Sequence, residues 1–148
     1  MSEQLYLVAH IAGRGVAIAS SQVESAVDIG EITPTPLAPN HIRGLAALRS
    51  RVVTVIDTHA ALGIAAQGTP ASRAVITAVD GHHYAVLVDS LEDVAPFTAA
   101  PLPPGIALDA SWRAAGCGEI ERDGEPILVV DLTALIRGRG NNDAITVN

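Results

Sequence analysis

The 148-residue sequence contains no lysine, only one cysteine and few aromatic side chains. Its nine basic residues are all arginines, and sixteen acidic residues outnumber them, so the formal net charge is −7. Proteins that bind nucleic acids need clustered basic side chains to neutralise phosphates. This composition therefore argues against a nucleic-acid partner.

A single cysteine excludes a disulfide or a thiolate metal site within one chain. Cys117 lies between two glycines, and we interpret it as a small residue at the start of a strand, with a reactive thiol as the alternative. No apolar run is long enough to span a membrane, and the N-terminal residues lack the basic region and cleavage pattern of a signal peptide. We therefore expect a cytoplasmic protein that does not insert into the membrane.

The scarcity of aromatic residues means that the core consists of Val, Ile, Leu and Ala, which together make up most of the 49% apolar content. Tyr6, Tyr84, Phe97 and Trp112 are too few to form stacking platforms for bases or sugars. A chain of this length forms one compact unit. We expect a single domain over residues 1–148, with a flexible tail over 139–148.

What the sequence does contain is a series of short β-branched runs that end at turn or capping residues. Residues 52–56 (VVTVI) favour a strand, and Asp57 is typical of a helix N-cap. Gly63 is the expected stop of a helix over residues 58–62. Residues 127–138 repeat this order of strand, capping Asp131, short helix and glycine stop.

The remaining chain follows the same pattern of short strands and turns. Asp80-Gly81 predicts a hairpin turn, as do residues 13–15 and 122–125. Proline-rich loops are expected over residues 32–40 and 101–104, and a flexible connection over 65–72. Further strands are expected over residues 5–11, 16–19, 23–27, 74–79, 84–88, 91–97 and 119–121. The class is all-β, with two related sub-barrels.

No pattern of reactive residues indicates catalysis or metal binding. Asp57, Asp89 and Asp131 each follow an apolar strand, but helix capping accounts for two of them. The five histidines, at positions 10, 41, 59, 82 and 83, are not spaced to converge on a metal ion. We expect no enzyme activity, no cofactor and no metal.

The stretch 42–57 resembles the most recognisable segment of the CheW family of bacterial chemotaxis coupling proteins. The matching positions are Ile42, Gly44, Leu48, Arg49, residues 52–56 and Asp57. The sequence departs from the family pattern at Ala47, Ser50, Thr54 and Thr58. The order and spacing of the strands extend the resemblance over most of residues 5–136.

The resemblance implies a fold of two intertwined five-stranded SH3-like barrels with short helices. It also implies a non-catalytic adaptor that joins the cytoplasmic signalling tip of a chemoreceptor to the regulatory domain of a CheA-type histidine kinase. The protein-interface residues that we assign on this basis are Val23, Arg43, Gly44, Arg49, Val75 and Leu91.

Two of these assignments have structural alternatives. Val23 can equally be an ordinary core residue, and Arg49 can form an internal salt bridge, for example to Glu24. Gly44 is expected to serve backbone geometry more than contact. An alternative function is a small β-barrel enzyme or ligand-binding protein that uses a pocket between the sub-barrels.

Overall fold

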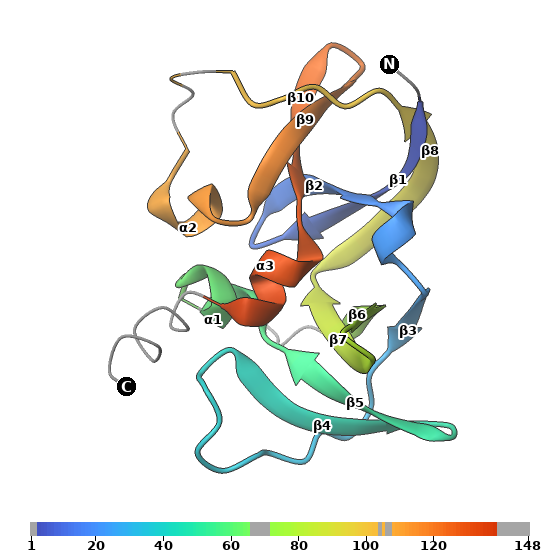
Figure 1. The fold of residues 1–148 in the computed structure, drawn as a ribbon, viewed down its shortest axis with the longest axis vertical. Helices are drawn as coiled ribbons and strands as arrows, with labels where there is room; N and C mark the ends of the chain where they lie inside the picture. Colours follow the sequence, from blue (N-terminus) through green and yellow to red (C-terminus); the bar gives the residue numbers. More distant parts are fainter. Residues whose placement is uncertain (1–2, 66–71, 104, 106–107, 139–148) are drawn as a thin grey trace.

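A computed structural model describes residues 3–65, 72–103, 105 and 108–138. Two five-stranded sheets lie one above the other in Figure 1, and two short helices lie side by side between them. Sheet A has the order β8 (Ser90–Phe97), β1 (Gln4–Ile11), β2 (Arg14–Ala19), β10 (Glu125–Val130), β9 (Gly116–Arg122). Sheet B has the order β3 (Ser25–Asp28), β6 (Arg73–Val79), β7 (His82–Val88), β5 (Arg51–Ile56), β4 (Ile42–Leu48). The helical segments are η1 (Ser20–Gln22), α1 (Thr58–Leu62), α2 (Ala110–Arg113) and α3 (Leu132–Arg137).

The two halves of the chain exchange strands. The first half contributes the hairpin β1–β2 to sheet A and then crosses to sheet B with β3, β4 and β5. The second half does the reverse, with β6–β7 in sheet B and then β8, β9 and β10 in sheet A. A parallel pair joins the halves within each sheet, β2 with β10 and β5 with β7. The predicted all-β class and the intertwined arrangement are confirmed.

Tight two-residue turns connect three of the antiparallel hairpins. Asp80-Gly81 has two successive positive φ angles, 53° and 81°, and Asp123-Gly124 has 53° and 82°. The first hairpin turns at Ala12-Gly13, with 53° and 79°, so the turn expected over residues 13–15 begins one residue earlier. Such mirror-image turns match the right-handed twist of paired strands, which explains why the strand resumes at Arg14.

Each sheet closes on itself through one isolated bridge. Thr33, beyond β3, pairs with Leu45 of β4, and Ala100, beyond β8, pairs with Glu119 of β9. In each case the paired residues exchange two backbone hydrogen bonds of 2.8 and 2.9 Å. The bridges connect the two edge strands of each sheet, and this makes the sheets barrels.

Aspartates begin both inter-barrel helices, as predicted. Asp57 accepts a hydrogen bond from the Ala60 N–H at 3.1 Å, and Asp131 accepts one from the Thr133 N–H at 3.0 Å. Gly63 ends α1 in the left-handed conformation, with φ 73°. Both helices bury an apolar face, and this packing stabilises helices that are too short to persist alone.

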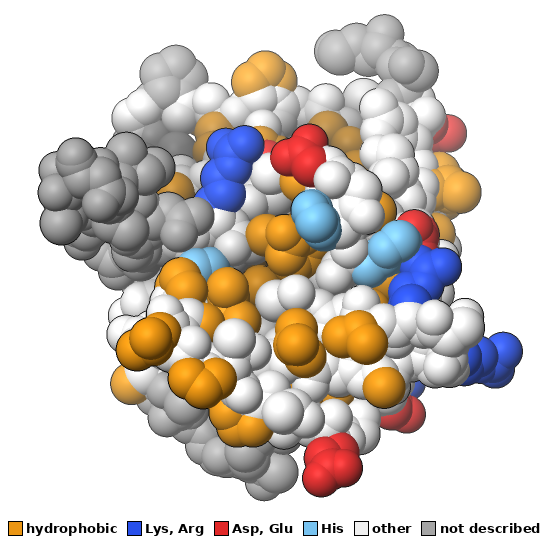
Figure 2. All heavy atoms as spheres, turned by 60° about the horizontal axis from the view of Figure 1, so that its bottom comes forward, with side chains coloured by type: hydrophobic (Ala, Val, Ile, Leu, Met, Phe, Trp, Pro, Cys, Tyr) orange, Lys and Arg blue, Asp and Glu red, His pale blue; other side chains and the backbone are white. Residues whose placement is uncertain are grey.

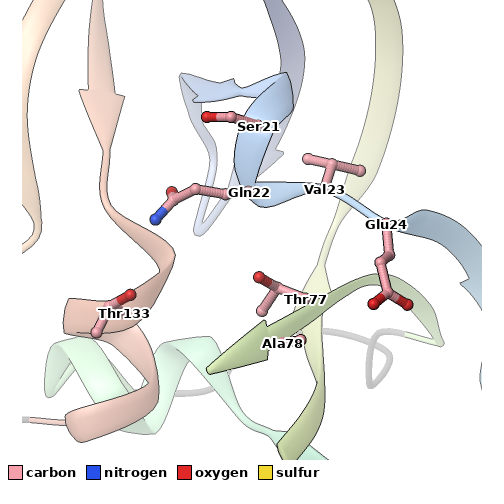
Figure 3. Close-up of a pocket in the computed structure, with 7 residues that line it drawn as sticks. All are labelled: Ser21, Gln22, Val23, Glu24, Thr77, Ala78 and Thr133. Atoms are coloured by element: carbon pink, nitrogen blue, oxygen red, sulfur yellow. The ribbon is translucent and has the colours of Figure 1, made fainter. Parts of the chain in front are cut away.

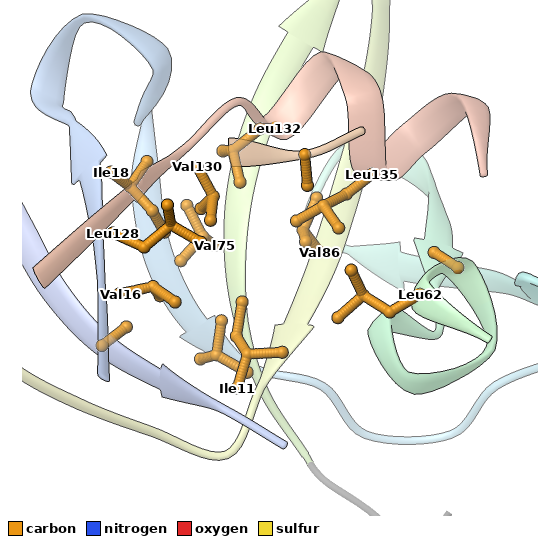
Figure 4. Close-up of a cluster of buried hydrophobic side chains, with 14 of the residues drawn as sticks. Ile11, Val16, Ile18, Leu62, Val75, Val86, Leu128, Val130, Leu132 and Leu135 are labelled. Carbon is orange, nitrogen blue, oxygen red and sulfur yellow. The ribbon is translucent and has the colours of Figure 1, made fainter. Parts of the chain in front are cut away.

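The largest core cluster lies between the two sheets (Figure 4). It combines Val16 and Leu128 from sheet A with Val86 from sheet B. Leu62 of α1 and Leu135 of α3 complete it from the helices, and both are at most 1% exposed. Burial of each such side chain stabilises the fold by roughly 1.5–3 kcal/mol.

The expectations for the tail 139–148, for most of the connection 65–72 and for Pro104 fall outside the described residues. Within the described part of the chain, no helix has both the length and the apolarity needed to cross a membrane.

Candidate functional site

A pocket of about 240 Å³ opens where the two barrels meet (Figure 3). One wall is η1 and the residues after it, the second is the end of β6, and the third is the first turn of α3. Its lining is mostly polar and consists of Ser21, Gln22, Val23, Glu24, Thr77, Ala78 and Thr133. The pocket thus contains Val23, one of the interface residues assigned from the sequence.

Gln22 holds two walls of the pocket together. Its side-chain nitrogen donates to the Asp131 carboxylate at 2.8 Å, and its side-chain oxygen accepts from the Leu132 N–H at 3.1 Å. Asp131 in turn caps α3. The bond joins residues 109 positions apart, so η1 is fixed against α3.

Glu24, at the rim of the pocket, interacts with two basic side chains. Its carboxylate oxygens lie 3.5 Å from Arg51 Nη1 and 3.1 Å from His83 Nε2. The salt bridge suggested between Glu24 and Arg49 is therefore wrong, because Arg51, two residues further on, takes that place. Arg49 is exposed at the tip of the β4–β5 hairpin with φ 51°.

Two exposed apolar residues lie on sheet A. Leu5 is 50% exposed and Val94 is 54% exposed. Val94 pairs with Leu7, two residues from Leu5, so both side chains lie on the face of the sheet that buries Leu7 in the inter-barrel core. Strand β1, which carries Leu5, also contacts η1.

A second apolar surface covers the β4–β5 hairpin. Leu45 is 40% exposed and Val52 is 61% exposed, and Ala47 pairs with Val52. Figure 2 shows hydrophobic side chains spread over this end of the molecule, with charged ones mostly at the margins. Arg49, an interface residue assigned from the resemblance, lies at the tip of this hairpin.

Arg43 forms a hydrogen bond with Asp57, the residue that caps α1. Its Nη2 donates to the Asp57 carboxylate at 2.8 Å. Burial alone raises the pKa of Asp57, but the hydrogen bonds from Arg43 and from the Ala60 N–H outweigh it, so the pKa lies below its ordinary value of 3.8. The Arg43 side chain is 30% exposed.

Gly44 serves the backbone. It has φ 151°, and a Cβ atom there would lie 2.2 Å from the Thr33 carbonyl oxygen. Only glycine lets the closing bridge of sheet B approach this strand. Gly118 occupies the corresponding place in sheet A, where a Cβ would lie 2.9 Å from the Ala100 oxygen.

The burial of three assigned interface residues, Val75, Leu91 and Val23, bears on their roles. Val75 is fully buried in the inter-barrel core and lies in β6 between its partner strands β3 and β7, so its side chain offers no exposed surface to a partner. Leu91 and Val23 are half-buried and pack against the same core. The sequence analysis missed Leu5, near the start of β1, and Val94, in the middle of β8.

Two histidines lie beside carboxylates. His10 Nε2 is 3.3 Å from Glu92, and His59 Nε2 is 3.4 Å from Asp89. Asp89 also accepts a bond from the Gly13 N–H at 3.2 Å, so it holds a turn and does not cap a helix. Among the described residues, no three His, Cys, Asp or Glu side chains are grouped as metal ligands.

Cys117 is the second residue of β9 and is exposed. Burial of the sulfur raises the pKa of the thiol, and the Asp131 carboxylate raises it further. A raised pKa keeps the thiol protonated near neutral pH, which disfavours the reactive-thiol alternative.

Comparison with known families assigns this architecture. The model of the CheW-like domain matches residues 5–139. The chain belongs to the CheW-like domain family.

Among solved structures, the scaffolding protein TtCheW from Thermoanaerobacter tengcongensis superposes with a TM-score of 0.78 at 26% sequence identity. The match covers 95% of this chain and 96% of that one. No curated protein sequence matches significantly. For a CheW-like protein, both findings support a scaffold or adaptor role in chemotaxis.

Proposed function

We propose that this CheW-like protein is a non-catalytic adaptor that couples chemoreceptors to a CheA-type histidine kinase. The family match over nearly the whole chain carries the proposal. The partners are the cytoplasmic signalling tip of the receptor and the regulatory domain of the kinase. The protein acts in the cytoplasm, where receptor arrays at the membrane recruit it.

The described surface supports two separate contacts. One surface includes the exposed Leu5 and Val94 of sheet A, and the other is formed by Leu45, Val52 and the arginine at the hairpin tip. Exposed aliphatic side chains with a nearby arginine are typical of protein interfaces. Two contacts at opposite parts of the molecule suit a protein that bridges two partners.

The pocket gives little support to the alternative of a small-molecule binding protein or an enzyme. Ligand sites for metabolites usually enclose about 300–1,000 Å³ and are mostly apolar. The pocket here holds about 240 Å³, and its only ionisable lining group, Glu24, is paired with Arg51 and His83.

A binding assay tests the adaptor proposal. Purified protein is titrated with the cytoplasmic receptor fragment and with the kinase encoded by the same organism. We expect both to bind, and we expect Arg49→Glu to raise one of the two Kd values about tenfold, as for a central arginine of an interface. Arg137→Glu, at another exposed arginine, makes the same change in net charge and serves as the control. Wild-type protein that binds neither partner would contradict the adaptor function.

A further inference from the structure

The half-buried His59 has a ring nitrogen without a hydrogen-bond partner. His59 is the second residue of α1, and its side chain is 17% exposed. Among the residues that the structure describes, its Nε2 is the one buried side-chain nitrogen or oxygen that forms no hydrogen bond. Buried polar groups are nearly always paired, so this exception calls for a physical reason.

The unpaired nitrogen faces a carboxylate. Nε2 of His59 lies 3.4 Å from Oδ1 of Asp89, but the contact lacks the geometry of a hydrogen bond. A neutral imidazole leaves one of its nitrogens without a proton, whereas a protonated ring donates from both nitrogens and carries a positive charge. The contact therefore becomes an ion pair only when the ring is protonated.

Asp89 lies where the chain crosses from one barrel to the other. It follows β7 of sheet B and precedes β8 of sheet A. Its N–H donates to the His10 carbonyl at 2.8 Å, and its Oδ2 accepts from the Gly13 N–H at 3.2 Å. Helix α1 follows β5 of sheet B and packs against α3 and β7 (Figure 1). An ion pair between His59 and Asp89 thus connects this helix to the crossover and to the β1–β2 hairpin.

A second carboxylate also favours a charged ring at this position. Asp57, the N-cap of α1, interacts electrostatically with His59. Arg43 already donates a hydrogen bond to Asp57 at 2.8 Å, so part of the negative charge of Asp57 is compensated. Asp89 is therefore the carboxylate that gains most from protonation of His59.

The elements packed around α1 bring no charge that takes the place of Asp89. On α3, Arg137 is exposed, and the capping Asp131 is bonded to the side chain of Gln22. The start of α1 contacts the end of β7, where the Thr58 hydroxyl donates to the Leu87 carbonyl. The titratable residues of β7 all lie in the first half of that strand: His82, His83 and Tyr84.

A more exposed histidine offers an internal comparison. His10 Nε2 lies 3.3 Å from Glu92, but these two side chains are 37% and 34% exposed. Glu92 is also paired with Arg122 at 2.8 Å. Exposed ion pairs contribute little because water and salt screen them. Protonation of His10 should therefore affect the fold less than protonation of His59.

We propose that His59 and Asp89 form a pH-sensitive tie, which connects α1 to the crossover between the barrels when the imidazole is protonated. Imidazoles change their charge between about pH 5 and pH 8, whereas aspartate carboxylates stay ionised there. The tie is closed at the acidic end of this range and open at the alkaline end. How firmly the two barrels are joined then depends on the surrounding pH.

Thermal unfolding at pH 6 and pH 8 tests the tie. An ion pair that needs the protonated ring stabilises the fold at pH 6, and this stabilisation is lost as the pH rises. The melting temperature of wild type should exceed that of His59→Gln by about 2–4 °C more at pH 6 than at pH 8. Asp89→Asn should remove the same gain, although its amide oxygen can still accept the Gly13 hydrogen bond. His10→Gln is the matched control and should retain the gain.

A titration followed by NMR shows whether protonation reaches the β1–β2 hairpin. Between pH 8 and pH 6, the Gly13 amide should shift with the same midpoint as the His59 ring protons, because both groups contact Asp89. The Gly13 shift should disappear in His59→Gln and remain in His10→Gln. If His59→Gln does not fold, Asp89→Asn takes its place, and its His59 ring should titrate without the Gly13 shift.

Each outcome decides a part of the proposal. If the stability gain at pH 6 is absent and the Gly13 amide does not follow His59, the proposal is wrong. If folded His59→Gln keeps the Gly13 shift, or if His10→Gln removes the stability gain, another group senses the pH and the proposal is also wrong. If the gain is present while Gly13 does not shift, the tie holds α1 alone, and the connection to the hairpin is wrong.

Discussion

At the scale of single residues, Asp57 combines a structural and an electrostatic role. It caps α1 through the Ala60 N–H and also accepts the hydrogen bond from Arg43. Both contacts favour the ionised carboxylate, so its folded pKa lies below 3.8 despite the burial that opposes this. The ionised form of Asp57 therefore stabilises the fold above about pH 4. This contribution is lost as the pH falls through the lowered pKa that Asp57 has in the folded protein.

Removing the charge of Arg43 should reveal this dependence. We expect Arg43→Met to lower the free energy of unfolding at pH 7 by about 1 kcal/mol, because one partly exposed charged hydrogen bond is lost. Urea denaturation between pH 7 and pH 2 measures the effect, and the difference from wild type should shrink below pH 3.8. Arg51→Met, in an exposed pair at 3.5 Å, is the control with a smaller effect. If Arg43→Met lowers the free energy of unfolding equally at every pH, the effect comes only from packing of the aliphatic part of the arginine side chain.

At the scale of elements, the same device closes both barrels. The segment after β3 bridges to β4, and the segment after β8 bridges to β9. A glycine next to each bridged residue, Gly44 or Gly118, lets the two backbones approach. The repeated order of strand, aspartate cap and helix that is visible in the sequence is thus one part of a larger structural repeat.

A methyl group at position 44 should break the closing bridge of sheet B. We expect Gly44→Ala to destabilise the protein by about 2–4 kcal/mol, because the residue has φ 151° and its Cβ would collide with the Thr33 carbonyl. Gly30→Ala is the matched control, since nothing lies within 4 Å of its Cβ, and it should change stability by no more than about 0.5 kcal/mol. Thermal unfolding followed by circular dichroism compares the two. Equal melting temperatures would show that the bridge can move aside.

At the scale of the whole molecule, the two barrels share their main core. The inter-barrel cluster draws buried residues from both sheets and from α1 and α3. Two smaller clusters belong to one barrel each, one around Val53 in sheet B and one around Ile120 in sheet A. Because each half of the chain contributes strands to both sheets, neither barrel can form from one half of the chain alone.

This arrangement predicts that the barrels unfold together. Val53→Ala removes buried methyl groups from the sheet B cluster and should cost about 2 kcal/mol. Hydrogen exchange should show lower protection in β1 and β2 of sheet A as well as in β6 and β7 of sheet B. Ile120→Ala makes the reciprocal change in sheet A. A loss of protection confined to the mutated barrel would contradict cooperative unfolding.

Much of the local structure followed from the sequence. The β-branched runs, the Asp-Gly turns and the aspartate caps depend on neighbouring residues, so they were predictable one segment at a time. The family resemblance added the intertwined topology and the assignment of Arg49 to a protein interface. Val23 and Leu91, assigned to an interface from the resemblance, are half-buried and pack against the inter-barrel core.

The site required contacts between distant parts of the chain. Val75 reads as an ordinary strand residue, yet the partner strands on both sides and the opposite sheet bury it completely. Arg49 and Arg51 are equivalent in a sequence pattern, and only the position of Glu24 across the sheet decides which of them forms the ion pair.

By itself, then, the sequence determined the short strands, their turns and caps, the repeat of these units and the absence of a basic surface. Tertiary structure alone decided the pocket, the exposure of Leu5 and Val94, and the clash that requires glycine at position 44. The physical reason is the separation along the sequence of the residues that interact. Capping and turn formation act over a few residues, whereas the pocket depends on Gln22 meeting Asp131 from 109 positions away.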